Sequence, residues 1–342
     1  MSARARWLLI AAISFVALGA TTVVGVIAWA QFQQRQAGPS EVDVSPVVPT
    51  GDRIVFRNTA SGEGYGHVAS VPLGDPTGAR AVSDIACDRV DATAELVSCL
   101  RTVRGIAPTY TASLYSVDGQ QQAGWPLPGI PNRTRISSDG DLVATTSFVT
   151  GHSYATIGFS TETVIHSADG DDVGNLEDWT LRISGEVSAP VDRNFWGVTF
   201  VDDDSFYATA GLTTAGVTYL VRGSISDREL TTLAENVECP SLSPDGTRIA
   251  FKRVTAGSGP TVHWTPAVYD IATGDITVLP EQRSIDDQIE WLDDDTILYG
   301  MPRADVPGDS DVWALAADGS AEPEVFLQHA WSPAVVKTGG AS

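Results

Sequence analysis

Basic residues are scarce in this chain of 342 residues, because Lys and Arg total 21 against 43 Asp and Glu and give a formal net charge of −22. Lysine itself occurs only at Lys252 and Lys337. A surface with this excess of negative charge repels phosphate backbones, which argues against a nucleic-acid partner.

Cysteine is also scarce, with three residues, and the five histidines are scattered along the chain. Zinc sites commonly place their ligands in closely spaced pairs such as Cys-x-x-Cys, and the sequence has no such pair. We therefore expect no metal and no other cofactor.

Motifs of three large enzyme classes are missing. The sequence has no Gly-x-Ser-x-Gly, which presents the nucleophile of α/β-hydrolases on a strand-to-helix turn. It has no phosphate-binding P-loop and no dinucleotide fingerprint. No long amphipathic helix is recognisable after residue 31, so we expect no second domain of the α/β type within these residues. On these grounds the sequence predicts that the protein is not an enzyme.

One long apolar run is present near the start, WLLIAAISFVALGATTVVGVIAWA from Trp7 to Ala30, and it carries no charge. As a helix with a rise of about 1.5 Å per residue it would span about 36 Å, enough for a hydrocarbon core of about 30 Å. Trp7 and Trp29 suit the two membrane interfaces, and Arg4 and Arg6 favour a cytoplasmic N-terminus.

We therefore interpret residues 1–30 as a single transmembrane anchor in the cell membrane, with the rest of the chain extracytoplasmic. The alternative is a signal segment cleaved near Ala30, because Ala28–Ala30 reads as a small-x-small cleavage site, and the remainder would then be secreted. Residues 31–50 lack periodicity and are rich in Gln, Pro and Ser, which is typical of a flexible linker.

The three cysteines suggest one disulfide in an exported protein. Cys87 and Cys99 flank DRVDATAELVS, which reads as strand, turn and strand around Thr93. Positions at equal distance from such a turn face each other across a hairpin, so we predict a Cys87–Cys99 bond. The alternative is three buried thiols. Cys239 would remain as an inert thiol within a strand.

A turn followed by a strand recurs along the chain, in RISSDGDLVATTSF, TFVDDDSFYATAG, LSPDGTRIAFKRV and EWLDDDTILYGMP. The central aspartates are Asp139, Asp203, Asp245 and Asp294, at spacings of 64, 42 and 49 residues. Each copy reads as a β-hairpin and is accompanied by a second turn, so a unit holds about four strands. Four strands in 40 to 65 residues is the period of a β-propeller blade.

Counting blades gives six. Five start near Val82, Pro131, Phe195, Val237 and Ile285. The sixth is split between GDRIVFRNTA, from Gly51, and HAWSPAVV near the C-terminus. Pairing these two segments would close the ring and remove the open edge. We therefore predict an all-β fold, a six-bladed propeller over residues 51–342 closed by the C-terminal strand.

The Ser-Pro-Asp-Gly turn with RIAF, followed by VYDIATG, resembles the WD40-like (PD40) repeat of TolB-type propellers. The match is strongest over residues 237–280 and weaker over 285–336. As a whole the chain is similar to the exported actinobacterial group called "TolB-like translocation protein; signal peptide". The resemblance implies a six-bladed propeller. It does not imply the Tol machinery, because a membrane segment and a short linker stand where TolB has an α/β domain.

The acidic turns have two interpretations. The runs Asp202–Asp204 and Asp293–Asp295 offer clustered oxygens that could bind calcium. Asp and Gly also suit a turn, because the Asp side chain accepts hydrogen bonds from neighbouring backbone N–H groups. Their equivalent positions in successive repeats favour the structural role.

Connections between blades should present charged and aromatic side chains around one mouth of the central channel. We predict a ligand-binding funnel there, made of Arg133, Arg135, Asn194, Trp196, Glu238, Asp286, Asp287, Gln288 and Glu290. Such a funnel suits a peptide or a small polar ligand. Asp287 or Glu290 opposite Glu238 could instead form an acid/base pair, and the same residues could simply be solvated loop residues.

The sequence thus favours a membrane-tethered, monomeric propeller that serves as an interaction module of the cell envelope. Its partner would be an unidentified envelope protein or peptide, and its contact with the membrane would be the N-terminal helix. The alternative is an exported propeller enzyme, a hydrolase or lyase acting on a polar substrate such as a glycan at the funnel.

Overall fold

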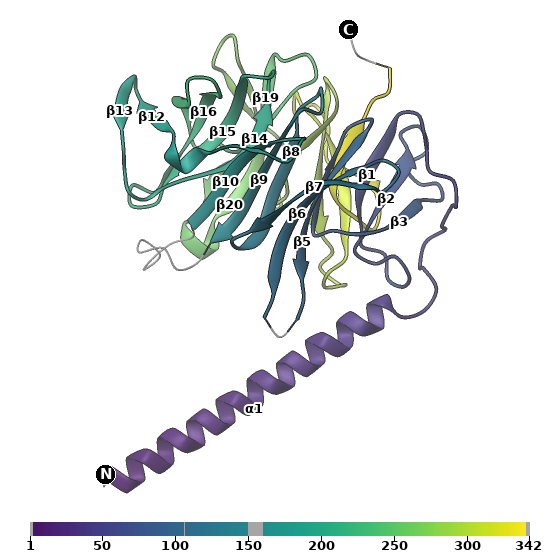
Figure 1. The fold of residues 1–342 in the computed structure, drawn as a ribbon, viewed down its shortest axis with the longest axis vertical. Coiled ribbons are helices and arrows are strands. Elements are labelled where there is room, and N and C mark those ends of the chain that lie inside the picture. Colours follow the sequence, from purple (N-terminus) through teal and green to yellow (C-terminus); the bar gives the residue numbers. More distant parts are fainter. Residues whose placement is uncertain (1–2, 106, 150–159, 340–342) are drawn as a thin grey trace.

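The computed structural model describes residues 3–105, 107–149 and 160–339. They form one long helix, α1 (Ala3–Gln36), and a β-propeller (Figure 1). Residues Arg4–Ala30 of α1 are long and apolar enough to cross a membrane, and none of them is buried. A helix of this kind at the N-terminus can serve as an anchor or as a signal segment.

Six sheets form the propeller, which confirms the predicted fold. Blade 1 has the strand order β26 (Ala330–Val336), β1 (Arg53–Asn58), β2 (His67–Pro72), β3 (Ala81–Ala86). Blade 2 runs β4 (Arg89–Ala92), β5 (Leu96–Val103), β6 (Thr109–Ser116), β7 (Gln121–Leu127). Blade 3 runs β8 (Ile130–Ile136), β9 (Leu142–Val149), β10 (Ser160–Ser167), β11 (Asp172–Asn175).

The second half of the ring has the same plan. Blade 4 runs β14 (Arg193–Phe200), β15 (Ser205–Leu212), β16 (Val217–Ser224), β17 (Glu229–Glu235) and is extended by β12 (Thr180–Ile183) and β13 (Glu186–Ser188). Blade 5 runs β18 (Glu238–Leu242), β19 (Arg248–Ala256), β20 (His263–Asp270), β21 (Ile276–Val278). Blade 6 runs β22 (Glu290–Asp293), β23 (Thr296–Pro302), β24 (Ser310–Ala316), β25 (Glu324–Leu327). Two short 3-10 helices, η2 (Leu176–Asp178) and η3 (Gly259–Thr261), lie between strands.

The ring closes as predicted, because β26 pairs antiparallel with β1, with Val55 opposite Ala334. One boundary differs from the prediction. The blade expected to start near Val82 begins at β4, and Val82 instead pairs with Ala69 of β2 and so belongs to the outer strand of blade 1.

Blade 4 has an extension that the repeat pattern did not indicate. Its strand β12 pairs in parallel with β17, with Leu181 opposite Leu230. The segment that leads into β12 buries Leu176 and Trp179 in the same core cluster as Phe206 of β15. This buried apolar surface explains why the two added strands attach to blade 4.

The core lies between neighbouring blades. Phe56 of blade 1, for example, packs in one cluster with Leu298 and Val312 of blade 6. Every blade contributes alternate apolar side chains to such a cluster, as expected for sheets packed face to face.

The propeller has two faces, a turn face and a crossover face, which are formed by different loops. The turn face carries the connection from each inner strand to the second strand, including the turns at Asp139, Asp203, Asp245 and Asp294. The crossover face carries the connections from one blade to the next and those between the second and third strands, including the β5–β6 connection.

The Cys87–Cys99 disulfide is present, with the two Cα atoms 5.5 Å apart. In the register of blade 2, however, Cys99 lies opposite Val90, and Cys87 precedes β4. The bond therefore fixes the start of the inner strand to β5. Cys239 is a free, buried thiol.

The chain between α1 and β1 follows the outer edge of blade 1. The stretch expected to be a linker is helical up to Gln36. Beyond it, Gly38 O accepts from Glu63 N at 3.0 Å, and Ser45 N donates to Arg80 O at 2.9 Å. Figure 1 shows this segment rising from the end of α1 beside the propeller to reach β1.

Candidate functional site

The inner strands β26, β4, β8, β14, β18 and β22 contact one another in a ring around the central channel. Three of them end at equivalent points. The second residues of β5, β9 and β23, which are Val97, Val143 and Ile297, pair with Ala92, Ile136 and Trp291 of the inner strands. The residue before each of these partners is Asp91, Arg135 or Glu290. Equivalent register therefore places these three charged residues at one level of the channel.

Arg135 joins the two carboxylates at this level, which we call the turn half of the channel. Its Nη1 lies 3.4 Å from Asp91 Oδ1 and also donates to Glu290 Oε2. Its Nη2 donates to Ile289 O at 3.3 Å. The amide oxygen of Gln288, once the amide is oriented to satisfy its neighbours, accepts from the same guanidinium. Two carboxylates therefore share one cation.

The excess of one carboxylate over the single cation affects the pKa of Asp91. Burial raises its pKa, the Glu290 charge raises it further, and Arg135 opposes both, which leaves a pKa of about 6. A carboxyl group with this pKa exchanges its proton near neutral pH, as an acid/base group must.

A cavity of about 650 Å³ opens from this level onto the turn face. Its floor contains Asp91, Arg135 and Glu290. The apolar part of its lining consists of Phe200, Leu242, Trp291, Val335 and others, and the charged part of its rim of Asp293, Asp294 and Lys337.

The crossover half of the channel is built from other charges. Arg89 Nη1 lies 2.8 Å from Asp287 Oδ1, and the Asp287 side chain is completely buried. Asp287 Oδ2 also accepts from Gly300 N at 3.1 Å. A Cβ at position 300 would lie 2.4 Å from that oxygen, so glycine is required for this approach.

The second acid of this half, Asp286, is held by cations. Lys252 Nζ lies 2.7 Å from its Oδ1, and Arg133 Nη2 lies 3.7 Å away. Burial acts to raise the pKa of Asp286, but Lys252 and Arg133 outweigh it and keep the pKa below its usual value. The cations of this half therefore keep Asp286 ionised.

The structure separates the predicted funnel residues. Arg135, Gln288 and Glu290 meet in the turn half, and Arg133, Asp286 and Asp287 lie in the crossover half. Asn194 and Trp196 are buried in the wall of blade 4, where Asn194 Oδ1 accepts from Thr161 N. Glu238 Oε1 accepts from Trp264 Nε1 at 3.0 Å. Arg89, Asp91 and Lys252 were not predicted.

The carboxylate that shares Arg135 with Glu290 is Asp91, and not Glu238. The signal that could have found Asp91 is its register. Within RVDATAEL it stands at the same inner-strand position as Arg135 and Glu290, and an alignment of all six inner strands would have shown this.

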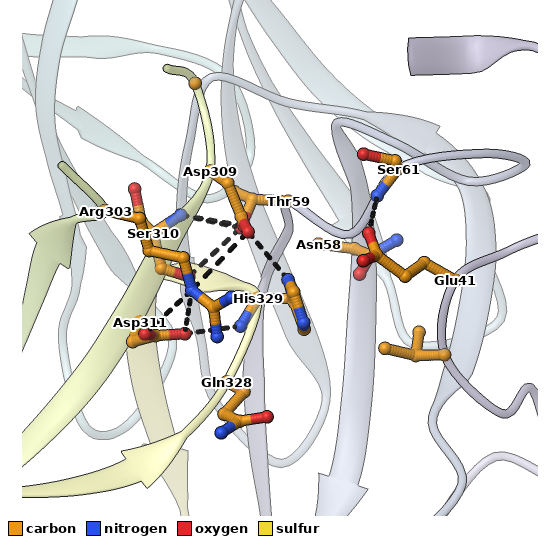
Figure 2. Close-up of polar contacts among 12 residues, drawn as sticks. Glu41, Asn58, Thr59, Ser61, Arg303, Asp309, Ser310, Asp311, Gln328 and His329 are labelled. Carbon is orange, nitrogen blue, oxygen red and sulfur yellow. Dashed lines mark hydrogen bonds and ion pairs between the residues drawn. The ribbon is translucent and has the colours of Figure 1, made fainter. Parts of the chain in front are cut away.

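A second polar cluster, at the contact of blades 6 and 1 on the crossover face, is shown in Figure 2. Asp309 Oδ2 lies 2.8 Å from His329 Nδ1, and Asp309 Oδ1 accepts from Thr59 Oγ1 at 2.7 Å. Arg303 pairs with Asp311, whose Oδ1 accepts from His329 N. The cluster fixes the loop that leads into the closing strand β26.

The acidic turns accept hydrogen bonds from backbone N–H groups. Asp202 Oδ1 accepts from Asp204 N and Ser205 N of its own turn, and Asp294 Oδ1 accepts at 3.0 Å from Asp245 N in the turn of the neighbouring blade. Among the residues that the structure describes, no group of three or more His, Cys, Asp or Glu could hold a metal ion. These bonds agree with the structural interpretation of the turns.

No family model and no curated protein matches the sequence. A puromycin-hydrolyzing peptidase of Mycobacterium tuberculosis is similar in structure, with 13% identity and a TM-score of 0.51, over 86% of this chain and 46% of that chain. The β-propeller domain of the Trilobed protease from Pyrococcus furiosus (14% identity, TM-score 0.41, 70% of each chain) also matches. So does an oligogalacturonate lyase in complex with manganese (11% identity, TM-score 0.44, 73% of this chain and 71% of that chain).

The present chain spans about half the length of the peptidase. At these identities the likeness shows the propeller fold alone. The resemblance to TolB-type repeats is not carried by any family model.

The prediction that the protein is not an enzyme is wrong as it stands. It relied on missing motifs, yet the puromycin-hydrolyzing peptidase contains a propeller of this fold within an enzyme. Enzymatic function is therefore compatible with the fold, and the absence of Gly-x-Ser-x-Gly argues only against a nucleophile elbow in this sequence.

Proposed function

We propose that this chain is a membrane-tethered, extracytoplasmic propeller that binds a protein or peptide of the cell envelope at the turn-face cavity. We further propose that the bound segment carries positive charge. The observation behind this proposal is the charge at the cavity floor, where Asp91 and Glu290 share the single cation of Arg135.

The surroundings of the cavity add to the negative charge. Lys337 is one cation on a rim that includes Asp293 and Asp294. Further acidic residues stand on the adjoining turns, namely Asp139, Asp202, Asp203, Asp204, Asp245 and Asp295. A concave site lined by one sign of charge concentrates ligands of the opposite sign and speeds their association.

The size and walls of the cavity suit a side chain on a peptide. Its volume of about 650 Å³ falls within the roughly 300–1,000 Å³ of ordinary ligand sites. Phe200, Leu242 and Trp291 provide apolar contact for the methylene stem of a lysine or arginine, while the charged end can reach the carboxylates.

The test is equilibrium binding to the full chain in lipid nanodiscs, with Lys- and Arg-containing peptides compared with the same peptides carrying Gln. Asp293→Asn with Asp294→Asn removes charge at the rim, where both side chains are exposed. Asp305→Asn makes the same type of change on an exposed residue of the crossover face.

We expect basic peptides to bind at least about tenfold more tightly than the Gln peptides, and the rim variant to lose most of that preference. Asp305→Asn should bind as the wild type does. Equal affinity for Lys and Gln peptides, or an equal loss in both variants, would contradict the proposal.

A second candidate is catalysis on a polar substrate such as a glycan at the same cavity. Asp91 has a pKa of about 6 and stands beside Glu290, so Asp91 can take up or release a proton near neutral pH at the floor of the cavity. A turnover abolished by Asp91→Asn but retained by the rim variant would favour this function over peptide binding.

A further inference from the structure

The position of α1 relative to the propeller is fixed by the segment that follows it. Glu41 N donates to Ser61 O at 2.9 Å, and Glu63 N donates to Gly38 O at 3.0 Å. Ser61 and Glu63 belong to the β1–β2 connection, which lies on the crossover face. Figure 2 shows Glu41 and Ser61 beside the cluster at the closure of the ring. The helix therefore leaves the propeller from the crossover face.

Little chain separates this face from the apolar part of the helix. The apolar span ends at Ala30 and α1 continues to Gln36, which adds about 9 Å at a rise of about 1.5 Å per residue. A headgroup layer is about 5–7 Å thick. Hydrogen bonds to blade 1 begin at Gly38. If α1 spans a membrane, the crossover face stands at the surface of the bilayer.

One part of the crossover face extends to the level of the helix end. A cavity of about 280 Å³ is lined jointly by Gln36 and by Arg101, Val103 and Arg104 at the end of the β5–β6 hairpin. Figure 1 shows this hairpin directed toward α1. Arg101 and Arg104 are exposed, and the apolar side chain of Val103 is 41% exposed.

We propose that the β5–β6 hairpin rests on an anionic phospholipid surface. Arg101 and Arg104 would bind lipid phosphates and Val103 would enter the boundary between headgroups and acyl chains, which is the arrangement of interfacial segments. This inference rests on the proposed membrane tether, and it places the acidic turn face away from the bilayer.

The test uses the full chain reconstituted in phosphatidylcholine vesicles with and without phosphatidylglycerol. An environment-sensitive fluorophore is attached at Val103→Cys and, as the matched control, at Asp294→Cys on the turn face. The free cysteine of the wild type, Cys239, is buried, and labelled wild type measures its background. Lipids with a spin label near the headgroup serve as quenchers.

We expect quenching by the lipid at position 103 to exceed that at position 294 at least severalfold. Arg101→Gln with Arg104→Gln should lower the quenching at 103 in vesicles that contain phosphatidylglycerol and change it little without that lipid. Equal quenching at the two positions, or no effect of the two arginines, would overturn the inference.

Flotation of the same vesicles separates the two proposals. If the chain floats with the vesicles but position 103 is not quenched, the tether stands and the proposed orientation is wrong. If the chain does not float, the tether is refuted, and the inference about the hairpin is refuted with it.

Discussion

The two halves of the channel are formed by the same inner strands, but the pKa values of their carboxyl groups Asp286 and Asp91 are shifted in opposite directions. In the crossover half, Lys252 and Arg133 hold Asp286, and the pKa of that carboxyl lies below its usual value. In the turn half, Asp91 and Glu290 share Arg135, and burial raises the pKa of Asp91 to about 6.

The difference shows that burial and the number of cations within reach act together on the pKa of a carboxyl group. Asp91 is buried and shares one cation, whereas the Asp286 side chain is 72% exposed and has both Lys252 and Arg133 beside it. A ligand that brings one more positive charge would therefore find its place in the turn half.

The largest effect should come from removing the shared cation. Arg135→Met leaves Asp91 and Glu290 near each other without a cation, and we expect the free energy of unfolding to fall by about 3–5 kcal/mol. Urea unfolding measures it, with Arg101→Met, an exposed arginine, as the control. A loss no larger than that of the control would show that the turn half does not depend on Arg135.

The next effect is a pH dependence. The pKa of Asp91 is about 6 in the folded protein against an ordinary 3.8. Between about pH 4 and pH 6 the folded protein therefore binds more protons than the unfolded chain, and this contribution to stability falls as the pH rises. Asp91→Asn removes it, so the free energy of unfolding of the variant relative to the wild type should rise by on the order of 3 kcal/mol from pH 4 to pH 7.

Urea unfolding at several pH values measures this difference. Asp286→Asn is the comparison, because the low pKa of Asp286 gives the opposite sign. Its contribution is present above the ordinary pKa and is lost as the pH falls. A constant difference between Asp91→Asn and the wild type across this range would show that Asp91 does not titrate there.

Removing the disulfide tests whether both halves of the channel depend on the same strand, β4. Cys87 stands at the start of β4, which supplies Arg89 to one half and Asp91 to the other. Its two cysteines are 12 residues apart in sequence. A disulfide that closes a 15-residue loop stabilises a protein by roughly 3 kcal/mol, so we expect Cys87→Ser with Cys99→Ser to lower the free energy of unfolding by somewhat less than that.

Hydrogen exchange at the amides of residues 89–92 measures the effect on β4, and we expect it to be faster without the disulfide. Cys239→Ser is the control, because it keeps the Cys87–Cys99 bond. If those amides exchange no faster in the double variant, the bond does not support β4.

The smallest effect should follow from Asp286→Asn at neutral pH. Its side chain is 72% exposed, and the amide oxygen of the Asn variant can still accept from the buried Lys252 ammonium, so we expect the free energy of unfolding to fall by less than about 1 kcal/mol. Arg89→Met should cost more, because it leaves the completely buried Asp287 without its cation. If Asp286→Asn and Arg89→Met lower the free energy of unfolding equally, the exposure of the carboxylate does not decide what its ion pair contributes in this half.

Much of the fold could be read from the sequence. Recurrent turns such as SSDG and SPDG, each followed by an alternating strand, predicted six blades and the pairing of β26 with β1. The extension of blade 4 could not be predicted, because β12 pairs in parallel with β17, a contact between segments about 50 residues apart that follows no repeat.

The site was only partly predictable. Arg135 and Glu290 were identified as charged residues on or near inner strands, but their partner Asp91 was missed because a single repeat does not show which residue faces it across the ring. Lys252 was missed for a similar reason, since it comes from a second strand and reaches Asp286 from the neighbouring blade.

The sequence by itself determined the propeller, its closure and the apolar helix, because these follow from periodicity and turn chemistry. It also indicated the disulfide, although Cys99 lies opposite Val90 and not opposite Cys87 in the hairpin. Only the tertiary structure decided which charges meet in the channel, which mouth opens into a cavity and from which face the helix leaves. These depend on the register of six strands brought together from distant parts of the chain, and on burial that exists only once the ring has closed.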